Sequence, residues 1–135
     1  MIQRRNGGGG QSLVEFALVI PLLLLAIMIL LDFGRVIYAQ NAIEHDARAA
    51  SRFASTSAPQ TDEAIRQRAR AIDPLVALPD SAITGESGSF YPDGTAEGQR
   101  VVVRIDVTVP LVTPFISTIV GGTATVSATA RDVIR

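Results

Sequence analysis

The sequence has no cysteine, lysine or tryptophan and only one histidine. Without cysteine there can be no disulfide, no thiolate metal site and no cysteine nucleophile. The 12 basic residues are all arginine and face 13 acidic residues, for a net charge of −1. No stretch of the sequence gathers enough arginine to follow a phosphate backbone, so we expect no nucleic-acid partner. A chain of 135 residues has room for one small domain, which must be held together by packing alone.

The patterns of catalytic and metal sites are also missing. His45 stands between Glu44 and Asp46 on a predicted helix, where neighbours in sequence point to different faces, so we expect it to be solvated. The acids between residues 73 and 93 lack the spacing of a calcium loop. The glycine run 7–10 precedes an apolar segment instead of following a strand. We therefore expect no catalytic residue, metal, cofactor or small-molecule substrate.

What the sequence does contain is one long apolar run. Residues 16–31 are apolar without a break, and Leu13 and Val14 extend the run backwards across Glu15. As a helix, residues 13–31 nearly cross a hydrocarbon layer of about 30 Å. A core helix of a small soluble domain would need a polar face, and this segment has none. The sequence predicts a transmembrane helix over about residues 13–31.

Flanking charges and glycines predict how this helix is oriented and processed. Arg4 and Arg5 precede the span without an acid, whereas the charges after it roughly cancel, so we expect the N-terminus in the cytoplasm and the C-terminal part outside. The alternative, a secretory signal peptide, has a shorter apolar core with small residues after it. Here residues 7–10 place the small residues before the core, so a cut there would leave the helix on the mature chain.

The segment around this junction resembles a type IV prepilin leader. More narrowly, GQSLVEFALVIPLLLL, then DFGRVIYAQ and DARAASRFA, is similar to the TadE-like family of tight-adherence (Flp) pilus systems over about residues 10–54. The resemblance implies a pilin-like subunit that a membrane prepilin peptidase cuts between Gly10 and Gln11. Glu15, fifth in the mature chain, is then the acidic position of the family motif. Phe16 replaces the tyrosine common in the much shorter major pilins, and both differences favour an accessory pseudopilin over a shaft subunit.

Two residues inside the apolar run each have two interpretations. An acid within a membrane helix costs about 2.5–3.5 kcal/mol at the centre and less near the interface. Glu15 is either an interfacial acid that reaches toward water without a partner, or the partner of the Gln11 amine on a neighbouring subunit. Pro21 removes a backbone donor and predicts a kink. It is either an ordinary membrane-helix proline or a position where the helix melts within a filament.

Beyond the span, the apolar spacing predicts that the helix continues to about residue 54. Its apolar face packs either on the chain's own C-terminal domain or on other subunits. A break around Pro59 precedes a short helix from Thr61 to Ile72, with Thr61 as its N-cap. The face of the long helix comprises Val36, Ile43, Ala47, Ala50 and Ala54, and that of the short helix Ile65, Ala69 and Ile72.

Two segments near the C-terminus alternate like half-buried strands. In Val101–Val109 the odd positions are apolar, and in Thr123–Arg131 the even positions are. We expect these strands to pair antiparallel with those residues facing the core. Residues 80–99 are predicted to form a loop with a short strand near Ile83. Residues 113–120 are predicted to connect the two strands, and Gly121 and Gly122 end this connection. The predicted fold class is α+β, pilin-like: a long N-terminal transmembrane helix, a short helix, and a small antiparallel sheet packed on both helices.

The predicted organisation is a prepilin-type leader (1–10), an N-terminal helix (11–54) and an extracytoplasmic α+β domain (55–135). The resemblance implies a minor TadE-like pseudopilin that takes part in assembly of a tight-adherence pilus. Its expected partners are the prepilin peptidase, other pilus or pseudopilin subunits, and the membrane. Its expected location is the cytoplasmic (inner) membrane as a single-pass protein, with later incorporation into the pilus. The alternative is a singly anchored extracytoplasmic adaptor or binding module that does not enter a filament.

Overall fold

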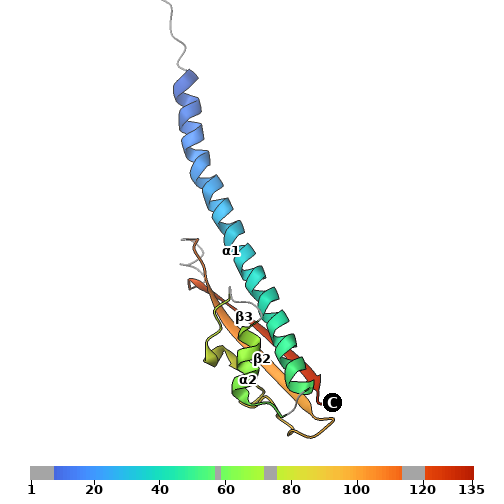
Figure 1. Cartoon of the computed structure of the whole chain (residues 1–135). Helices are drawn as coiled ribbons and strands as arrows, with labels where there is room; N and C mark the ends of the chain where they lie inside the picture. Colours follow the sequence, from blue (N-terminus) through green and yellow to red (C-terminus); the bar gives the residue numbers. More distant parts are fainter. Residues whose placement is uncertain (1–7, 57–58, 72–75, 114–120) are drawn as a thin grey trace, which may run out of the picture.

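The computed structural model describes residues 8–56, 59–71, 76–113 and 121–135. One long helix dominates it: its second half lies against a small sheet and a short helix, while its first half projects beyond them (Figure 1). The arrangement confirms the predicted α+β class. In chain order the elements are helix α1 (Gly8–Thr56), helix α2 (Asp62–Arg70), a 3-10 turn η1 (Asp80–Ala82), and strands β1 (Ile83–Thr84), β2 (Arg100–Pro110) and β3 (Thr123–Val133).

Helix α1 runs without interruption from the apolar run into the folded domain, as predicted. The predicted face of its second half is buried: Ile43, Ala47 and Ala50 have no exposed surface. Most of these side chains are alanines, so the helix can approach the sheet closely, where β3 presents Ala128 and Ala130. The small-residue face therefore packs on the chain's own C-terminal domain.

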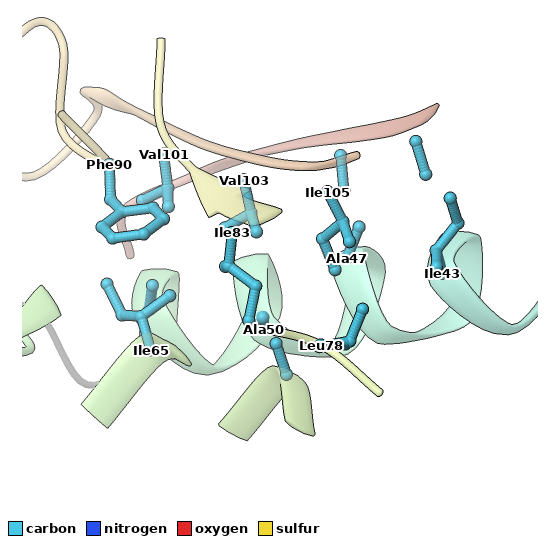
Figure 2. Close-up of a cluster of buried hydrophobic side chains, with 14 of the residues drawn as sticks. Ile43, Ala47, Ala50, Ile65, Leu78, Ile83, Phe90, Val101, Val103 and Ile105 are labelled. Atoms are coloured by element: carbon cyan, nitrogen blue, oxygen red, sulfur yellow. The ribbon is translucent and has the colours of Figure 1, made fainter. Parts of the chain in front are cut away.

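Helix α2 begins as predicted. The side chain of Thr61 accepts a hydrogen bond from the backbone N–H of Ala64 at 3.3 Å, which satisfies one of the free donors of the first turn. Ile65 and Ala69 are buried in the core that α1 shares with the sheet, and Ile65 points toward the ring of Phe90 (Figure 2). Ile72, predicted on the same face, lies outside the described residues.

The sheet has the order β1-β2-β3 and is antiparallel throughout. In the β2–β3 register Ile105 lies opposite Ala128, so odd residues of β2 face the same side as even residues of β3. This confirms the predicted pairing and faces, and β1 confirms the predicted short strand. The buried members of the face are Val101, Val103, Ile105 and Val109 of β2 with Val126, Ala128 and Ala130 of β3.

One residue departs from the predicted alternation. Val102 stands at an even position of β2, on the side opposite to the core residues, yet only 2% of its surface is exposed. The loop before β2 lies along this end of the strand, because the N–H of Val102 donates to the carbonyl of Phe90 at 3.0 Å. The outer face of β2 is therefore not solvated along its whole length. The predicted connection 113–120 falls, apart from Thr113, outside the described residues.

Candidate functional site: the anchor helix and its attachment

The first half of α1 exposes a continuous apolar surface. Its most apolar 18-residue window has a mean hydropathy of 2.9, and none of that window is buried inside the protein. Leu13, Leu18 and Leu30 each expose more than 65% of their surface. A core helix would bury such residues, and an apolar surface of this size marks contact with a membrane or another protein. By length and composition this half of α1 fits a single-pass membrane anchor.

The residues predicted for processing lie at the start of this helix, far along α1 from the folded domain. The peptide bond between Gly10 and Gln11 belongs to the first turn of α1, which starts at Gly8. Glycine is about 1 kcal/mol worse than alanine in a helix, so this end opens at little cost. Apart from the adjacent residues and the nearby backbone of α1, no atom of the described residues lies within 4 Å of the position where a Cβ of Gly10 would be.

Glu15 and its neighbour Phe16 are exposed on the apolar half of α1. Gln11 and Glu15 are four residues apart and therefore share a helix face. Within the described part of the chain, Glu15 makes no hydrogen bond and no ion pair. The fold thus brings no partner to this carboxylate, and pairing with a neighbouring subunit stays a prediction.

Pro21 lies inside α1, which continues as α-helix on both of its sides. Pro21 and Leu22 are exposed, and Ile20 is partly buried. The predicted kink and the predicted melting of the helix in a filament stay predictions.

The carboxylate of Asp32 attaches the anchor to the domain. In the sequence, this residue was only one of the charges that flank the predicted span. Asp32 is the first polar residue after the predicted span, and it is only 4% exposed. Its Oδ2 accepts hydrogen bonds from the hydroxyl of Thr113 at 2.7 Å and the N–H of Thr113 at 2.8 Å. The N–H of Val112 donates to the same carboxylate at 3.0 Å. The Thr113 hydroxyl, then the two backbone donors and the charge of Arg35, lower the pKa of Asp32.

This contact ties α1 to residues about 80 positions later in the chain, directly after β2. Thr113 is itself fully buried, so the two donors that it offers to Asp32 have little access to water. Asp32 lies one residue beyond the predicted span. Its contact with Thr113 therefore fixes the domain close to where the helix would leave the bilayer. No local signal identifies this role, because an acid that follows a membrane helix is most simply a boundary charge.

Replacing Asp32 with asparagine should lower the melting temperature of the exported domain by roughly 5 °C at pH 7. An amide carries no charge, and its NH2 group would face donors instead of accepting from them. Circular dichroism of the full chain in nonionic detergent measures the effect. Glu97→Gln, the same change at an exposed loop acid, should leave the melting temperature unchanged.

The effect of this substitution should depend on pH. The pKa of Asp32 is lowered in the folded state from an ordinary value of 3.8, so the unfolded chain binds its proton more readily. The stabilisation is therefore present above about pH 4 and is lost as the pH falls through the folded pKa. The difference in melting temperature between wild type and Asp32→Asn should become smaller below pH 4. Equal melting temperatures at pH 7 would contradict the structural role.

Some of the other charged side chains form surface pairs. Arg100 donates to Asp93 at 2.6 and 3.1 Å, and this lowers the pKa of Asp93 and raises that of Arg100. His45 is exposed as predicted, while the adjacent Asp46 is buried, so the two point to different sides. Among the residues that the structure describes, no group of three or more histidine or acidic side chains could hold a metal ion.

Fold and exposed helix together define a small α+β protein that carries a candidate single-pass membrane anchor. Residues 10–52 match the TadE-like protein family, which confirms the resemblance drawn from the sequence. The match covers most of α1 and leaves α2 and the sheet outside. Comparisons with curated proteins and with solved structures gave no match.

Proposed function

We propose that this chain is a minor pseudopilin that takes part in assembly of a tight-adherence pilus. The observation that carries the proposal is the exposed apolar half of α1, which falls in the TadE-like segment and projects from a folded domain (Figure 1). Such a helix is stable in a bilayer as a monomer. It can also pack against the helices of other pilus or pseudopilin subunits, since both environments cover its apolar surface.

In this proposal the precursor is a single-pass protein of the cytoplasmic membrane. Arg4 and Arg5 hold its N-terminus in the cytoplasm, and the domain that contains α2 and the sheet lies outside. Prepilin peptidase cuts after Gly10, where three glycines weaken the first turn of α1. The cut leaves a positive amine on Gln11, one helical turn from Glu15.

The test is the N-terminus of the protein, determined by mass spectrometry in cells with and without the prepilin peptidase. Wild type should begin at Gln11 only when the peptidase is present. Gly10→Phe should leave nearly all of the protein uncut, because the peptidase must accept a small residue beside the membrane surface. The space around Gly10 is open, so the larger side chain itself should not disturb α1.

Gly34→Phe is the matched control, since Gly34 is also an exposed α1 glycine with no atom within 4 Å of a Cβ. This variant should be cut normally. Normal cutting of Gly10→Phe at Gln11 would contradict the proposed cleavage. A wild-type protein that keeps Met1 in the presence of the peptidase would instead favour a singly anchored adaptor.

A further inference from the structure

A second feature lies at the opposite end of the domain from the anchor. There the last turns of α1 and the end of β3 enclose a groove of about 770 Å³, which we call the distal groove. Arginines from both elements dominate its lining: Arg48, Arg52, Arg131 and Arg135, with Asp132 as the one lining acid.

The charge of the distal groove is largely uncompensated. Arg48 pairs with Glu44 at 2.8 Å. In the described chain, Arg52, Arg131 and Arg135 take part in no ion pair. Three guanidinium groups therefore share the groove with one carboxylate, although the whole chain has a net charge of −1. Such a concentration of one sign attracts anions, and the planar guanidinium suits carboxylates in particular.

The wall that β3 contributes also offers backbone groups. In the order β1-β2-β3, β3 pairs with β2 along one side, and no strand of the described residues pairs with its other side. The carbonyl of Ser127 points to the other side, because it accepts a hydrogen bond from the Gln40 side chain of α1 at 3.2 Å. Peptide groups two residues apart point the same way in a strand, so those of Thr129 and Arg131 also face outward. Both residues line the distal groove.

Contacts between α1 and the C-terminal strand lie on both sides of this stretch of β3. The Gln40 side chain contacts Ser127, two residues before Thr129, and the N–H of Arg135 donates to the carbonyl of Ser55 at 3.2 Å. Between them the outward peptide groups of β3 lie beside the arginines. An exposed strand edge of this kind binds extended peptides by adding a strand.

We propose that the distal groove binds an extended acidic segment of a partner protein. The segment adds to the edge of β3 at Thr129 and Arg131, and its carboxylates pair with Arg52 and Arg131. Outward peptide groups recognise another peptide backbone, which a phosphate polymer lacks, and this favours a protein partner. The site lies at the end of the domain farthest along α1 from the predicted span. It goes beyond the proposed pilus function and does not depend on cleavage after Gly10.

The experiment measures binding of a fluorescent decapeptide of alternating Glu and Thr to the full chain in nonionic detergent. Alternation places all glutamates on one face of an added strand. Arg52→Gln and Arg131→Gln should each weaken binding about tenfold, through loss of a charge-assisted hydrogen bond. Arg35→Gln, the same change at an exposed arginine near the anchor, should leave binding unchanged. Binding should also weaken as salt is added.

Four results would overturn the proposal. The first two are that the Glu/Thr peptide does not bind, or that a Gln/Thr peptide binds equally well. The third is that Arg35→Gln weakens binding as much as Arg52→Gln and Arg131→Gln do. The fourth is that polyphosphate binds in an arginine-dependent way while the peptide does not bind. Arg52 and Arg131 are exposed, so their replacement should not unfold the domain, which circular dichroism checks. Equal binding by the uncut Gly10→Phe precursor and the mature chain is expected, and this keeps the result separate from the test of processing.

Discussion

Replacing Ile105 with aspartate should unfold the exported domain while the anchor helix still inserts into the membrane. Ile105 has no exposed surface and lies in the middle strand, opposite Ile83 of β1 and Ala128 of β3. An unpaired carboxylate there would cost several kcal/mol, whereas a whole domain is stable by about 5–15 kcal/mol. The α1 span is remote from this position and depends on its own apolar side chains.

Limited proteolysis of the membrane-bound protein measures this effect. Wild type should yield a resistant domain, and Ile105→Asp should be degraded beyond the anchor. The control is Thr108→Asp, because Thr108 is exposed on the same strand and a carboxylate there remains in water. A protease-resistant Ile105→Asp domain would contradict the assignment of this face to the core.

Replacing Glu15 with leucine should block assembly into pili without blocking insertion or cleavage. The change removes a polar group from the apolar run, so the span should insert at least as well. Glu15 is exposed, and in the described residues it has no hydrogen-bond or ion-pair partner, so the fold of the monomer should not change. In an assembly, the loss would leave the Gln11 amine of a neighbouring helix unpaired in an apolar interface, which is costly.

The measurement compares Glu15→Leu with Glu15→Gln and scores cleavage, membrane level and incorporation into pili separately. The Leu variant should be cut and inserted normally and incorporated at least about tenfold less. Leu22→Met, an exposed apolar exchange on the same helix, should assemble normally. Full assembly of Glu15→Leu would refute the pairing role.

The chemical state of Gln11 decides how Glu15 acts. If Gln11 is cyclised to pyroglutamate, the positive amine is lost and an ion pair cannot form. Glu15 must then serve as a hydrogen-bond acceptor or as a determinant of peptidase recognition. The mass of the mature N-terminus separates these cases, since cyclisation removes ammonia.

Elements whose signal is local were predictable from the sequence. The apolar run and the face that includes Ile43 and Ala50 predicted a single long helix, and Thr61 marked the start of α2. The alternation in β2 and β3 predicted both core faces, because a strand turns successive side chains to opposite sides. Burying one face of each strand also requires odd positions to pair with even ones, but which residue lies opposite which was seen only in the folded sheet.

Contacts between distant residues were decided only by the tertiary structure. In the sequence, Asp32 is a charge at the boundary of the predicted span. In the folded chain, the segment after β2 places Thr113 in hydrogen-bonding contact with it. Val102 is buried on the side of β2 that faces away from the core, at the end of the strand where its N–H bonds to Phe90. The arginines of the distal groove are dispersed in sequence, so no stretch predicted a basic surface, and the crossing of α1 and β3 gathers them. Periodicity reports which face of an element is apolar, whereas charge gathered from separate elements depends on how those faces meet in space.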